Sequence, residues 1–543
     1  MQQIDYIVFL IYFVTVAGYG IYIYRKHKTR EADSKDYFLA EGSLTWWAIG
    51  ASLIASNISA EQFIGMSGSG FAMGLAISTY EWMAALTLVI VAVFFIPIYL
   101  KNNIYTMPQF LSQRYNTTVS TIMAIFWLLV YVFVNLTSIL YLGALAVETV
   151  SGIDFTYCLY GLAIFAVFIT LGGMKVIGYT DVFQVLVLTI GGLATTYLAL
   201  DLVGDRFGSS GALSGLSLMH QKVSSHFHMI LEEGQLMMPD GQGGVRDAYM
   251  DLPGLSVLLG GMWIVNLSYW GANQYIVQRA LGADLKTARG GLLFAAFMKL
   301  LMPIIVVLPG IAAYTLYQEG MFQQEMIDQA GHIKPDHAYP VLLDLLPAGL
   351  KGLSFAALTA AIVASLAGKA NSISTIFVLD IYTKFFRKNA SEENKVAVGK
   401  LTVIAAVLIG VLFAPALRNL DQGFQYIQEY TGFISPGVLA IFLLGFFWKR
   451  TTALAATAAA VLTIPVSTLL KFQYPEVPFL DRMGIVCLLL IGVMVLLTLF
   501  DPKSRFNPKG LPLELSMFRA STPFVIGTLF ICGILSALYT AFW

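Results

Sequence analysis

The sequence predicts an all-α polytopic membrane protein with about fourteen transmembrane helices. Of its 543 residues, 57% are hydrophobic and 12% are charged, about half the charged share of roughly 25% in soluble domains. Its apolar residues gather in many runs that approach the length of about 20 residues needed for a membrane-spanning helix. The net charge is zero, which gives no sign of nucleic-acid binding. The chain is therefore expected to lie in a lipid bilayer.

Turn residues and charges separate the apolar runs and so mark the expected helices. In chain order the helices cover residues 5–24, 44–68, 74–98, 119–150, 154–172, 177–203, 253–276, 289–317, 350–382, 396–416, 422–447, 452–471, 481–500 and 521–541. Two long connections, 204–252 and 318–338, are expected outside the cell, the first with a short surface helix. His226 and His228 lie in the first connection and are expected to be solvated rather than to bind a metal.

The basic residues indicate the orientation of the helices. Most of the 32 Lys and Arg residues fall in alternate connections, beginning with the segment RKHKTR after the first helix. Cytoplasmic loops of membrane proteins carry such an excess of positive charge. This places the N-terminus outside, and an even number of helices returns the C-terminus to the same side.

Two of the expected helices are interrupted by similar polar motifs. The second contains NISAEQ, residues 57–62, and the seventh contains NLSYWGANQ, residues 266–274. The two helices are five apart in the chain, so they cross the membrane in opposite directions. Interrupted helices at corresponding places of two inverted halves indicate a transporter binding site, because the unwound backbone can bind a solute or a cation. The competing interpretation is that amides such as Asn57 and Gln62 only hydrogen-bond neighbouring helices.

Charged residues inside other apolar runs need partners, because a lone charge at bilayer depth is costly. Glu81 and Lys299 lie on equivalent helices of the two halves. Either a polyhydroxylated solute binds between them, or they form a structural ion pair. Asp181 either stabilises the N-terminus of the sixth helix through its negative charge or lies on the route of a cation. Lys369 is expected to lie near enough to the cytoplasmic side to extend towards it.

Several uncharged residues are further candidates. Asn135 lies in the middle of its span, and Gln425 and Gln428 share one helix face; these amides face either a cavity or a neighbouring helix. Tyr269 and Trp270 follow the second interruption, and aromatic rings can stack on the apolar face of a sugar. Ordinary packing is the competing interpretation and is favoured for Trp270.

The segments NISAEQFIGMSGSG, TYEWM, FVNLTSILYLG, NLSYWGANQYIVQR, FQYIQEYTG and LLGFFWKR resemble the solute:sodium symporter family over nearly the whole chain. The resemblance implies a core of two inverted five-helix repeats, the LeuT-type fold, with one extra helix before it and three after it. It divides the chain into a first helix and cytoplasmic link (1–43), a first repeat (44–203), an external loop (204–252), a second repeat (253–447) and three final helices (448–543).

The resemblance also implies which residues form the site. The sugar is expected to contact Asn57, Glu61, Gln62, Glu81, Asn135, Asn266, Lys299 and Gln428, with Tyr269, Trp270 and Asn273 as a gate. Sodium is expected to be bound by the carbonyls of Ala55, Ile58 and Ala361 and by the hydroxyl of Ser365, with Asp181 on its exit route. The pattern of sugar symporters has serines where this chain has Ala84 and Ala364, so one sugar contact and one sodium ligand are missing.

The activity implied by the resemblance is symport of a neutral monosaccharide, galactose or glucose, with one Na⁺ per sugar. The alternative within the family is another solute, namely an inositol, a sialic acid or an amino acid. A membrane-embedded enzyme is disfavoured, because the sequence contains no HExxH, GxSxG or GxxxxGK[ST] motif. The expected partners are the sugar, the coupling ion Na⁺ and the lipid of a bacterial inner (cytoplasmic) membrane. A homodimer is left open.

Overall fold

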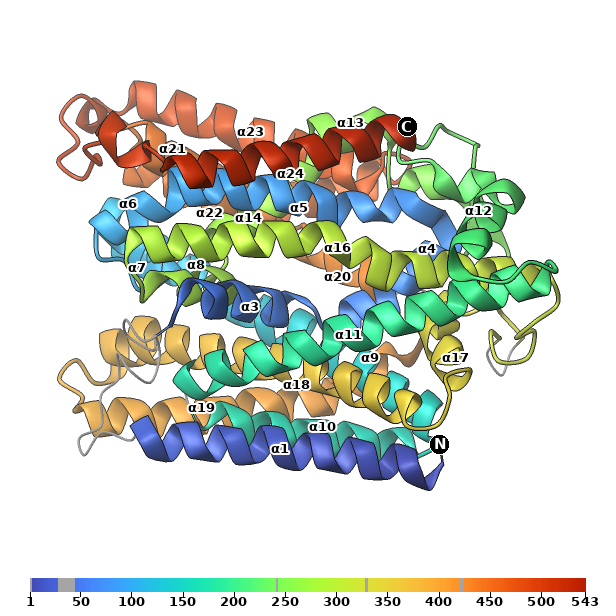
Figure 1. Ribbon diagram of the computed structural model, residues 1–543. Coiled ribbons are helices and arrows are strands. Elements are labelled where there is room, and N and C mark those ends of the chain that lie inside the picture. Colours follow the sequence, from blue (N-terminus) through green and yellow to red (C-terminus); the bar gives the residue numbers. More distant parts are fainter. Residues whose placement is uncertain (1, 28–43, 173, 241–242, 328–330, 420–422) are drawn as a thin grey trace.

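The computed structural model describes residues 2–27, 44–172, 174–240, 243–327, 331–419 and 423–543. The predicted basic link after the first helix, residues 28–43, thus lies outside the described residues. Long helices run side by side from one end of the molecule to the other, and both termini lie at the same end (Figure 1). Among the described residues, ten helical segments are long and apolar enough to span a membrane, and two bent pairs raise this to twelve.

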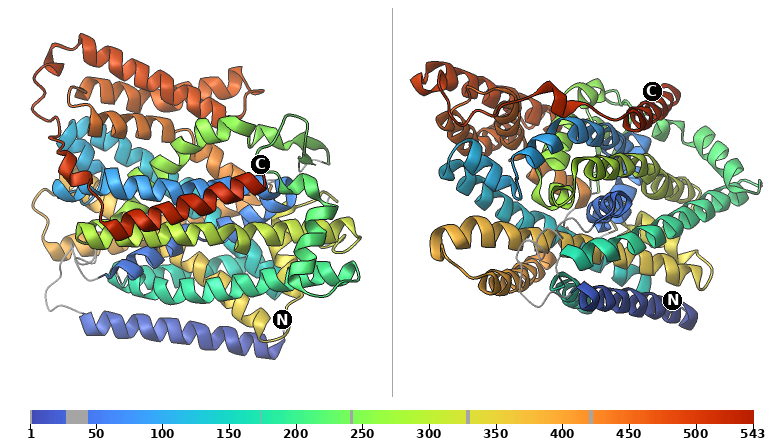
Figure 2. Two further views of the ribbon diagram at one scale, coloured as in Figure 1. Left: turned by 45° about the horizontal axis from the view of Figure 1, so that its top comes forward. Right: turned by 60° about the vertical axis from the view of Figure 1, so that its left-hand side comes forward.

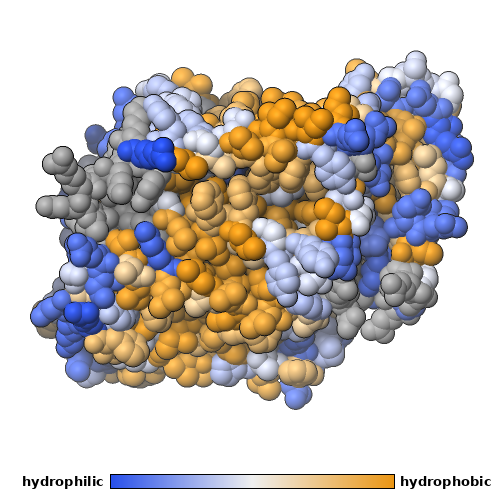
Figure 3. All heavy atoms as spheres, turned by 90° about the horizontal axis from the view of Figure 1, so that it is seen from below, coloured by the Kyte–Doolittle hydropathy of each residue, from blue (hydrophilic) through white to orange (hydrophobic). Residues whose placement is uncertain are grey.

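A hydrophobic band covers the middle of the molecule. Figure 3 shows it on one face, between hydrophilic regions at the two ends. A bilayer presents the same sequence of polar, apolar and polar layers. The chain is therefore a multi-pass helical membrane protein. The predicted total of fourteen spans stays a prediction.

Short 3₁₀ and π-helical segments, labelled η, connect or continue many of the α-helices. The part of the chain before the long loop forms α1 (Gln3–His27), α3 (Trp46–Asn57), η1 (Glu61–Met66), α4 (Ser67–Met73), η2 (Gly74–Ser78), α5 (Thr79–Ile90), η3 (Val91–Phe95), α6 (Ile96–Lys101), α7 (Met107–Arg114), α8 (Thr117–Leu129), η4 (Val130–Leu136), α9 (Thr137–Ser151), α10 (Phe155–Thr170) and α11 (Met174–Arg206). The loop forms α12 (Ala212–Lys222), η5 (Ser224–Phe227), β1 (Met237–Pro239), β2 (Val245–Asp247) and η6 (Ala248–Met250).

The part of the chain after the loop forms a second set of helices. They are α13 (Gly254–Leu259), α14 (Gly261–Ala272), α15 (Gln274–Leu281), α16 (Leu285–Gln318), η7 (Pro335–His337), α17 (Ala338–Asp344), α18 (Leu350–Ile376), η8 (Phe377–Phe386), α19 (Glu392–Phe413), η9 (Ala414–Asn419), α20 (Gly423–Thr431), α21 (Ser435–Phe447), α22 (Ala453–Gln473), α23 (Phe479–Phe500), η10 (Pro502–Ser504), η11 (Leu515–Phe518) and α24 (Thr522–Ala541).

Polar side chains fix where several helices begin. The side-chain oxygens of Asn116, Asp284 and Ser391 accept hydrogen bonds from backbone N–H groups in the first turns of α8, α16 and α19. Such caps satisfy donors that have no partner inside the helix. At the other end of α9, Gly152 adopts a left-handed conformation with φ of 73°, which favours glycine.

The first interrupted helix lies inside the bundle. Its first segment, α3, packs against α11, α16 and α18, and its later segment, α4, packs against α16. By contrast, α1 lies along the edge of the bundle, where it contacts α11 and α18 (Figure 2). The interruption is thus surrounded by protein, as a break in the hydrogen-bond ladder requires at membrane depth.

The predicted helices differ from the observed ones at three places. Residues 422–447 were expected to form one helix, but α20 and α21 are bent by 49° at residues 432–434. A 77° bend also separates α13 from α14. The all-α class holds for the spans, but the long loop adds an antiparallel pair, in which Met238 of β1 is opposite Arg246 of β2. Apolar runs indicate burial but do not show where a bend falls.

The long loop packs into the bundle through His226, which corrects the expectation that it is solvated. His226 is 2% exposed. Its ring stacks on Tyr314 of α16 at 3.9 Å between centroids, and its Nε2 lies 3.2 Å from the carbonyl oxygen of Phe71. Gly74, with φ of 67°, ends α4 beneath this residue, and a Cβ there would lie 2.3 Å from the His226 carbonyl oxygen. The loop therefore covers the end of α4, the second segment of the first interrupted helix.

His226 should make stability depend on pH. Burial lowers the pKa of His226 from its ordinary value of 6.5 to about 4. Between these values the unfolded chain binds a proton that the folded protein does not bind, so the free energy of unfolding is retained above pH 6.5 and falls by about 3 kcal/mol as the pH drops to 4. The midpoint of thermal unfolding should therefore depend more steeply on pH in the wild type than in His226→Gln. His228→Gln is the control, because His228 is only half-buried; equal slopes in the wild type and His226→Gln would contradict this prediction.

Candidate functional site

The first predicted interruption is present, and it falls directly after Asn57. Ile58 has an extended backbone, and its N–H makes the last hydrogen bond of α3, to Ile54. The next N–H, of Ser59, donates instead to Gln62 Oε1 at 3.0 Å. The Ser59 hydroxyl in turn accepts from the N–H of Glu61 at 3.1 Å, at the start of η1. The Gln62 side chain thus takes a donor that would otherwise continue the helix, and carbonyls at the end of α3 are left to other partners.

The second predicted interruption is also present, between α14 and α15. Asn273 is extended there, with φ of −96° and ψ of 126°. The hydroxyl of Tyr131, on η4, donates to Asn273 Oδ1 and accepts from the N–H of Gln274 at 3.0 Å. Tyr131 was not among the predicted site residues. Its hydroxyl joins the two segments of the broken helix.

Removal of the Tyr131 hydroxyl should impair the solute transport that the sequence predicts more than it impairs folding. In Tyr131→Phe the aromatic ring remains, but Asn273 Oδ1 and the N–H of Gln274 lose a shared partner in a buried place, which costs about 1–3 kcal/mol. We expect solute uptake to fall about tenfold while the thermal midpoint shifts by a few degrees. Tyr115→Phe is a matched control, because that buried hydroxyl also donates to a backbone oxygen, that of Ile441, which lies on α21 and not on the broken helix. Equal uptake by the two variants would contradict the prediction.

A polar cavity lies between the two interruptions. All eight residues predicted to contact the solute and all three predicted gate residues line it: Asn57, Glu61, Gln62, Glu81, Asn135, Asn266, Lys299, Gln428, Tyr269, Trp270 and Asn273. They come from α3, η1, α5, η4, α14, α16 and α20 and from the break after α14.

A hydrogen-bonded network crosses one wall of the cavity. The ammonium of Lys299 donates to Glu81 Oε2 and to Asn57 Oδ1. The Asn57 amide then donates to the hydroxyl of Tyr269 at 3.0 Å, and the Lys299 Nζ lies 5.1 Å from the centroid of the Trp270 ring. Lys299 and Glu81 therefore form an ion pair, which was one of the two alternatives, and both line the cavity. Binding of a solute between them stays a prediction.

A second buried ion pair joins α18 to η1. Lys369 Nζ donates to Glu61 Oε1 at 3.2 Å, and the lysine side chain is 1% exposed. The expectation that Lys369 extends to the cytoplasmic side is therefore wrong. Side chains on a helix tilt towards its N-terminus, so Lys369 points back along α18 and into the protein.

Aromatic residues that the sequence analysis did not select complete the cavity. Tyr80, Tyr275 and Phe424 line it, and the rings of Tyr80 and Phe424 meet edge to face at 5.1 Å. Tyr80 is adjacent to Glu81, which is the one sequence signal that could have identified it. Of the two glutamines on α20, Gln428 lines the cavity, whereas the Gln425 side chain lies 3.9 Å from the sulfur of Met73.

The predicted sodium ligands lie where α18 meets the end of α3. Ser365 is fully buried, and its hydroxyl donates to the backbone oxygen of Ser56 at 3.2 Å. The predicted carbonyls belong to Ala55 and Ile58, on either side of Ser56, and to Ala361, one turn before Ser365 on α18. Carbonyl and hydroxyl oxygens are the ligands that hard cations prefer. The donor set fits Na⁺, and its role stays a prediction.

Asp181 lies within α11, beyond its first turn, so the interpretation as a helix cap is wrong. Asp181 Oδ2 accepts from the Ser52 hydroxyl at 2.5 Å and lies 3.6 Å from Arg279 Nη2. The Arg279 Nε donates to the backbone oxygen of Ser52 at 3.0 Å. All three groups are buried. The carboxylate thus joins α11 to α3 and α15, on the side of α3 that precedes the interruption.

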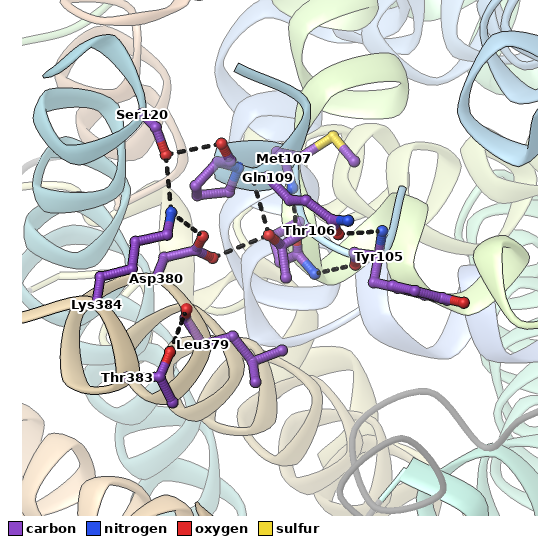
Figure 4. Close-up of polar contacts among 11 residues, drawn as sticks. Tyr105, Thr106, Met107, Gln109, Ser120, Leu379, Asp380, Thr383 and Lys384 are labelled. Carbon is purple, nitrogen blue, oxygen red and sulfur yellow. Dashed lines mark hydrogen bonds and ion pairs between the residues drawn. The ribbon is translucent and has the colours of Figure 1, made fainter. Parts of the chain in front are cut away.

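Another polar network lies at the end of the bundle opposite the termini (Figure 4). The Thr106 hydroxyl donates to Asp380 Oδ2 at 2.9 Å, and Lys384 Nζ donates to Asp380 Oδ1 at 2.8 Å. Next to Thr106, the N–H of Met107 donates to Gln274 Oε1 at 2.8 Å. The segment before α7 therefore contacts both η8 and the start of α15.

Two broken helices around a central polar cavity, in a multi-pass helical protein, define a secondary transporter. The chain belongs to the sodium:solute symporter family, which matches residues 37–462. It is a sodium-coupled solute symporter and not an enzyme.

Individual relatives and solved structures agree with this family. The chain is 46% identical to a sodium/glucose cotransporter of Vibrio parahaemolyticus over 100% of this chain and 99% of that protein. It is 34% identical to a sodium/myo-inositol cotransporter 2 of Sus scrofa over 88% and 71% of the two chains. A solved Na⁺-coupled sialic acid symporter in a substrate-bound outward-open state has a TM-score of 0.76 at 24% identity, covering 92% of this chain and 99% of that one. This last likeness shows the fold.

Proposed function

We propose that the protein carries a neutral monosaccharide, glucose or galactose, into the cell together with Na⁺. The observation that carries the proposal is the pairing of charges around the cavity. Each cavity carboxylate, of Glu81 and of Glu61, has one buried ammonium partner, Lys299 and Lys369 respectively. A solute that itself bears a charge would leave one charge without a counter-ion, which is costly in a buried site.

The remaining groups of the cavity suit a polyhydroxylated molecule. Asn57, Asn135, Asn266 and Gln428 supply amides that can both donate and accept hydrogen bonds. The edge-to-face rings of Tyr269 and Trp270, 5.1 Å apart, supply apolar surface for a sugar ring. Ala84 also lines the cavity, where sugar symporters resembling this chain have a serine. This substitution favours weaker binding of a sugar hydroxyl at that place.

In the proposed mechanism, sodium binds between the end of α3 and α18 and is coupled to the sugar. Ala55, Ile58, Ala361 and Ser365 would supply its oxygen ligands, with one Na⁺ per sugar, and Asp181 would lie on its route to the cytoplasm. One positive charge that moves down 100 mV releases about 2.3 kcal/mol. Alternating access would use this energy. Tyr269, Trp270 and Asn273 would close the cytoplasmic side of the cavity, and the ring pair of Tyr80 and Phe424 would cover its opposite side.

We further infer the arrangement of the chain in the membrane. Residues 44–203 and 253–447 would form the two inverted repeats, with one helix before and three after, in a bacterial inner membrane. Both termini lie at the same end of the bundle (Figure 1), which supports placing both on one side of the membrane, and the distribution of basic residues indicates the outside. The bend between α20 and α21 lies within the proposed second repeat.

Uptake into proteoliposomes tests the proposal. Purified protein is reconstituted, and uptake of radiolabelled glucose and galactose is followed with an inward Na⁺ gradient, with K⁺ in place of Na⁺, and without protein. We expect accumulation above the external concentration only with the Na⁺ gradient. Unlabelled myo-inositol, sialic acid and proline should compete less well than either sugar. Strong competition by one of these three would assign the protein to that solute.

A further inference from the structure

Lys369 lies directly behind the cavity wall. Its ammonium donates to Glu61 Oε1 at 3.2 Å and lies 5.1 Å from the centroid of the Tyr275 ring. Glu61 and Tyr275 line the cavity, whereas Lys369 lies outside that lining. The lysine therefore determines where the Glu61 carboxylate points without itself contacting a solute in the cavity.

Lys369 is also one helical turn after Ser365 on α18, so the two side chains lie on the same face of the helix. Ser365 contacts the backbone oxygen of Ser56, before the interruption. Lys369 contacts Glu61, after the interruption. One face of α18 thus holds both sides of the break in the first interrupted helix, through two contacts that are buried.

We infer that Lys369 is a positioning residue for symport, which ties the solute-binding carboxylate of Glu61 to the helix that carries the sodium ligand Ser365. This inference rests on the proposed function. A sodium ion at Ser365 holds α18 against the end of α3, and Lys369 then keeps Glu61 in the cavity wall. When sodium leaves and α18 separates from the break, Glu61 loses its counter-ion and the sugar site is altered.

The binding of sodium and the binding of sugar must affect each other equally. If sodium raises the affinity for sugar by some factor, sugar raises the affinity for sodium by the same factor, and such factors are typically about 5–150. Lys369 should carry part of that factor. A purely structural ion pair would affect folding and overall affinity, but it would leave the ratio of sugar affinities with and without sodium unchanged.

The test measures that ratio in purified full-length protein. The dissociation constant for glucose is determined at saturating Na⁺ and in K⁺ for the wild type, Lys369→Met and Lys369→Arg. We expect a ratio above about 5 in the wild type, a ratio below 2 in Lys369→Met, and recovery of more than half the wild-type ratio in Lys369→Arg. Lys384→Met is the control, because Lys384 lies on η8, the continuation of α18, and pairs with Asp380 rather than with Glu61. The ratio of sugar affinities in this variant should remain that of the wild type.

The outcomes separate this inference from the proposed function. A wild-type ratio near 1 would overturn the proposed sodium coupling itself. A normal ratio in both the wild type and Lys369→Met would overturn only the role of Lys369. If Lys369→Met does not fold, the double variant Lys369→Met/Glu61→Gln is measured in its place, because it contains neither an unpaired carboxylate at residue 61 nor an unpaired ammonium at residue 369. A ratio below 2 in the double variant supports the inference, and the wild-type ratio overturns it.

Discussion

Lys299→Met is expected to abolish sugar uptake. Lys299 is 1% exposed, and its ammonium contacts both Glu81 and Asn57. The substitution leaves the Glu81 carboxylate buried without its partner, which costs about 3–5 kcal/mol of stability. It also removes a charged donor from the cavity, and such hydrogen bonds contribute about 1.5–3 kcal/mol. The affinity for glucose should therefore fall by about 10- to 100-fold, as measured by equilibrium binding at saturating Na⁺.

The double variant Lys299→Met/Glu81→Gln shows whether the pair serves binding or only stability. It contains no buried unpaired charge at this place, so its thermal midpoint should return to near the wild-type value. If Lys299 also binds the sugar, as we propose, the affinity for glucose remains low in the double variant. Recovery of both stability and affinity would show that the pair is purely structural.

The interruptions and the charged cavity residues could be predicted because each is an anomaly in its segment. Asn57, Glu81 and Lys299 are polar residues inside apolar runs, and membrane depth makes such residues costly unless they have a function or a partner. The residues that were missed carry no such signal. Tyr131 is an aromatic residue in an apolar run, where contact with lipid, with the core and with a cavity all produce the same sequence pattern.

Two wrong predictions have a common physical cause. Lys369 was assigned to solvent because its long side chain was expected to reach the cytoplasmic side from its helix. His226 was assigned to solvent because it lies in a loop. The helix that carries Lys369 continues through η8 to Phe386, so the lysine is far from its end. The loop that carries His226 folds back onto α4 and α16. Both outcomes depend on contacts between segments that are distant in the sequence, which local patterns do not contain.

Ser365→Ala is expected to abolish accumulation driven by a sodium gradient. Ser365 is the one side chain among the four predicted sodium ligands, and the neighbouring position, Ala364, offers no hydroxyl as a replacement. Its loss also removes a hydrogen bond to the backbone oxygen of Ser56. The affinity for Na⁺ should fall by at least about tenfold, which corresponds to the loss of about 1.4 kcal/mol of binding free energy. Uptake of glucose into proteoliposomes should then no longer exceed equilibration at any Na⁺ gradient tested.

Ser374→Ala provides the matched control for this experiment. Ser374 lies on the same helix and is also fully buried, and its hydroxyl likewise donates to a backbone oxygen, that of Gly399 at 2.9 Å. That oxygen belongs to α19 and not to the first interrupted helix. The two substitutions thus remove the same group from α18 at similar burial, and only Ser365→Ala should reduce the affinity for Na⁺. Equal losses would mean that the effect arises from helix packing, and normal accumulation by Ser365→Ala would place the ion elsewhere.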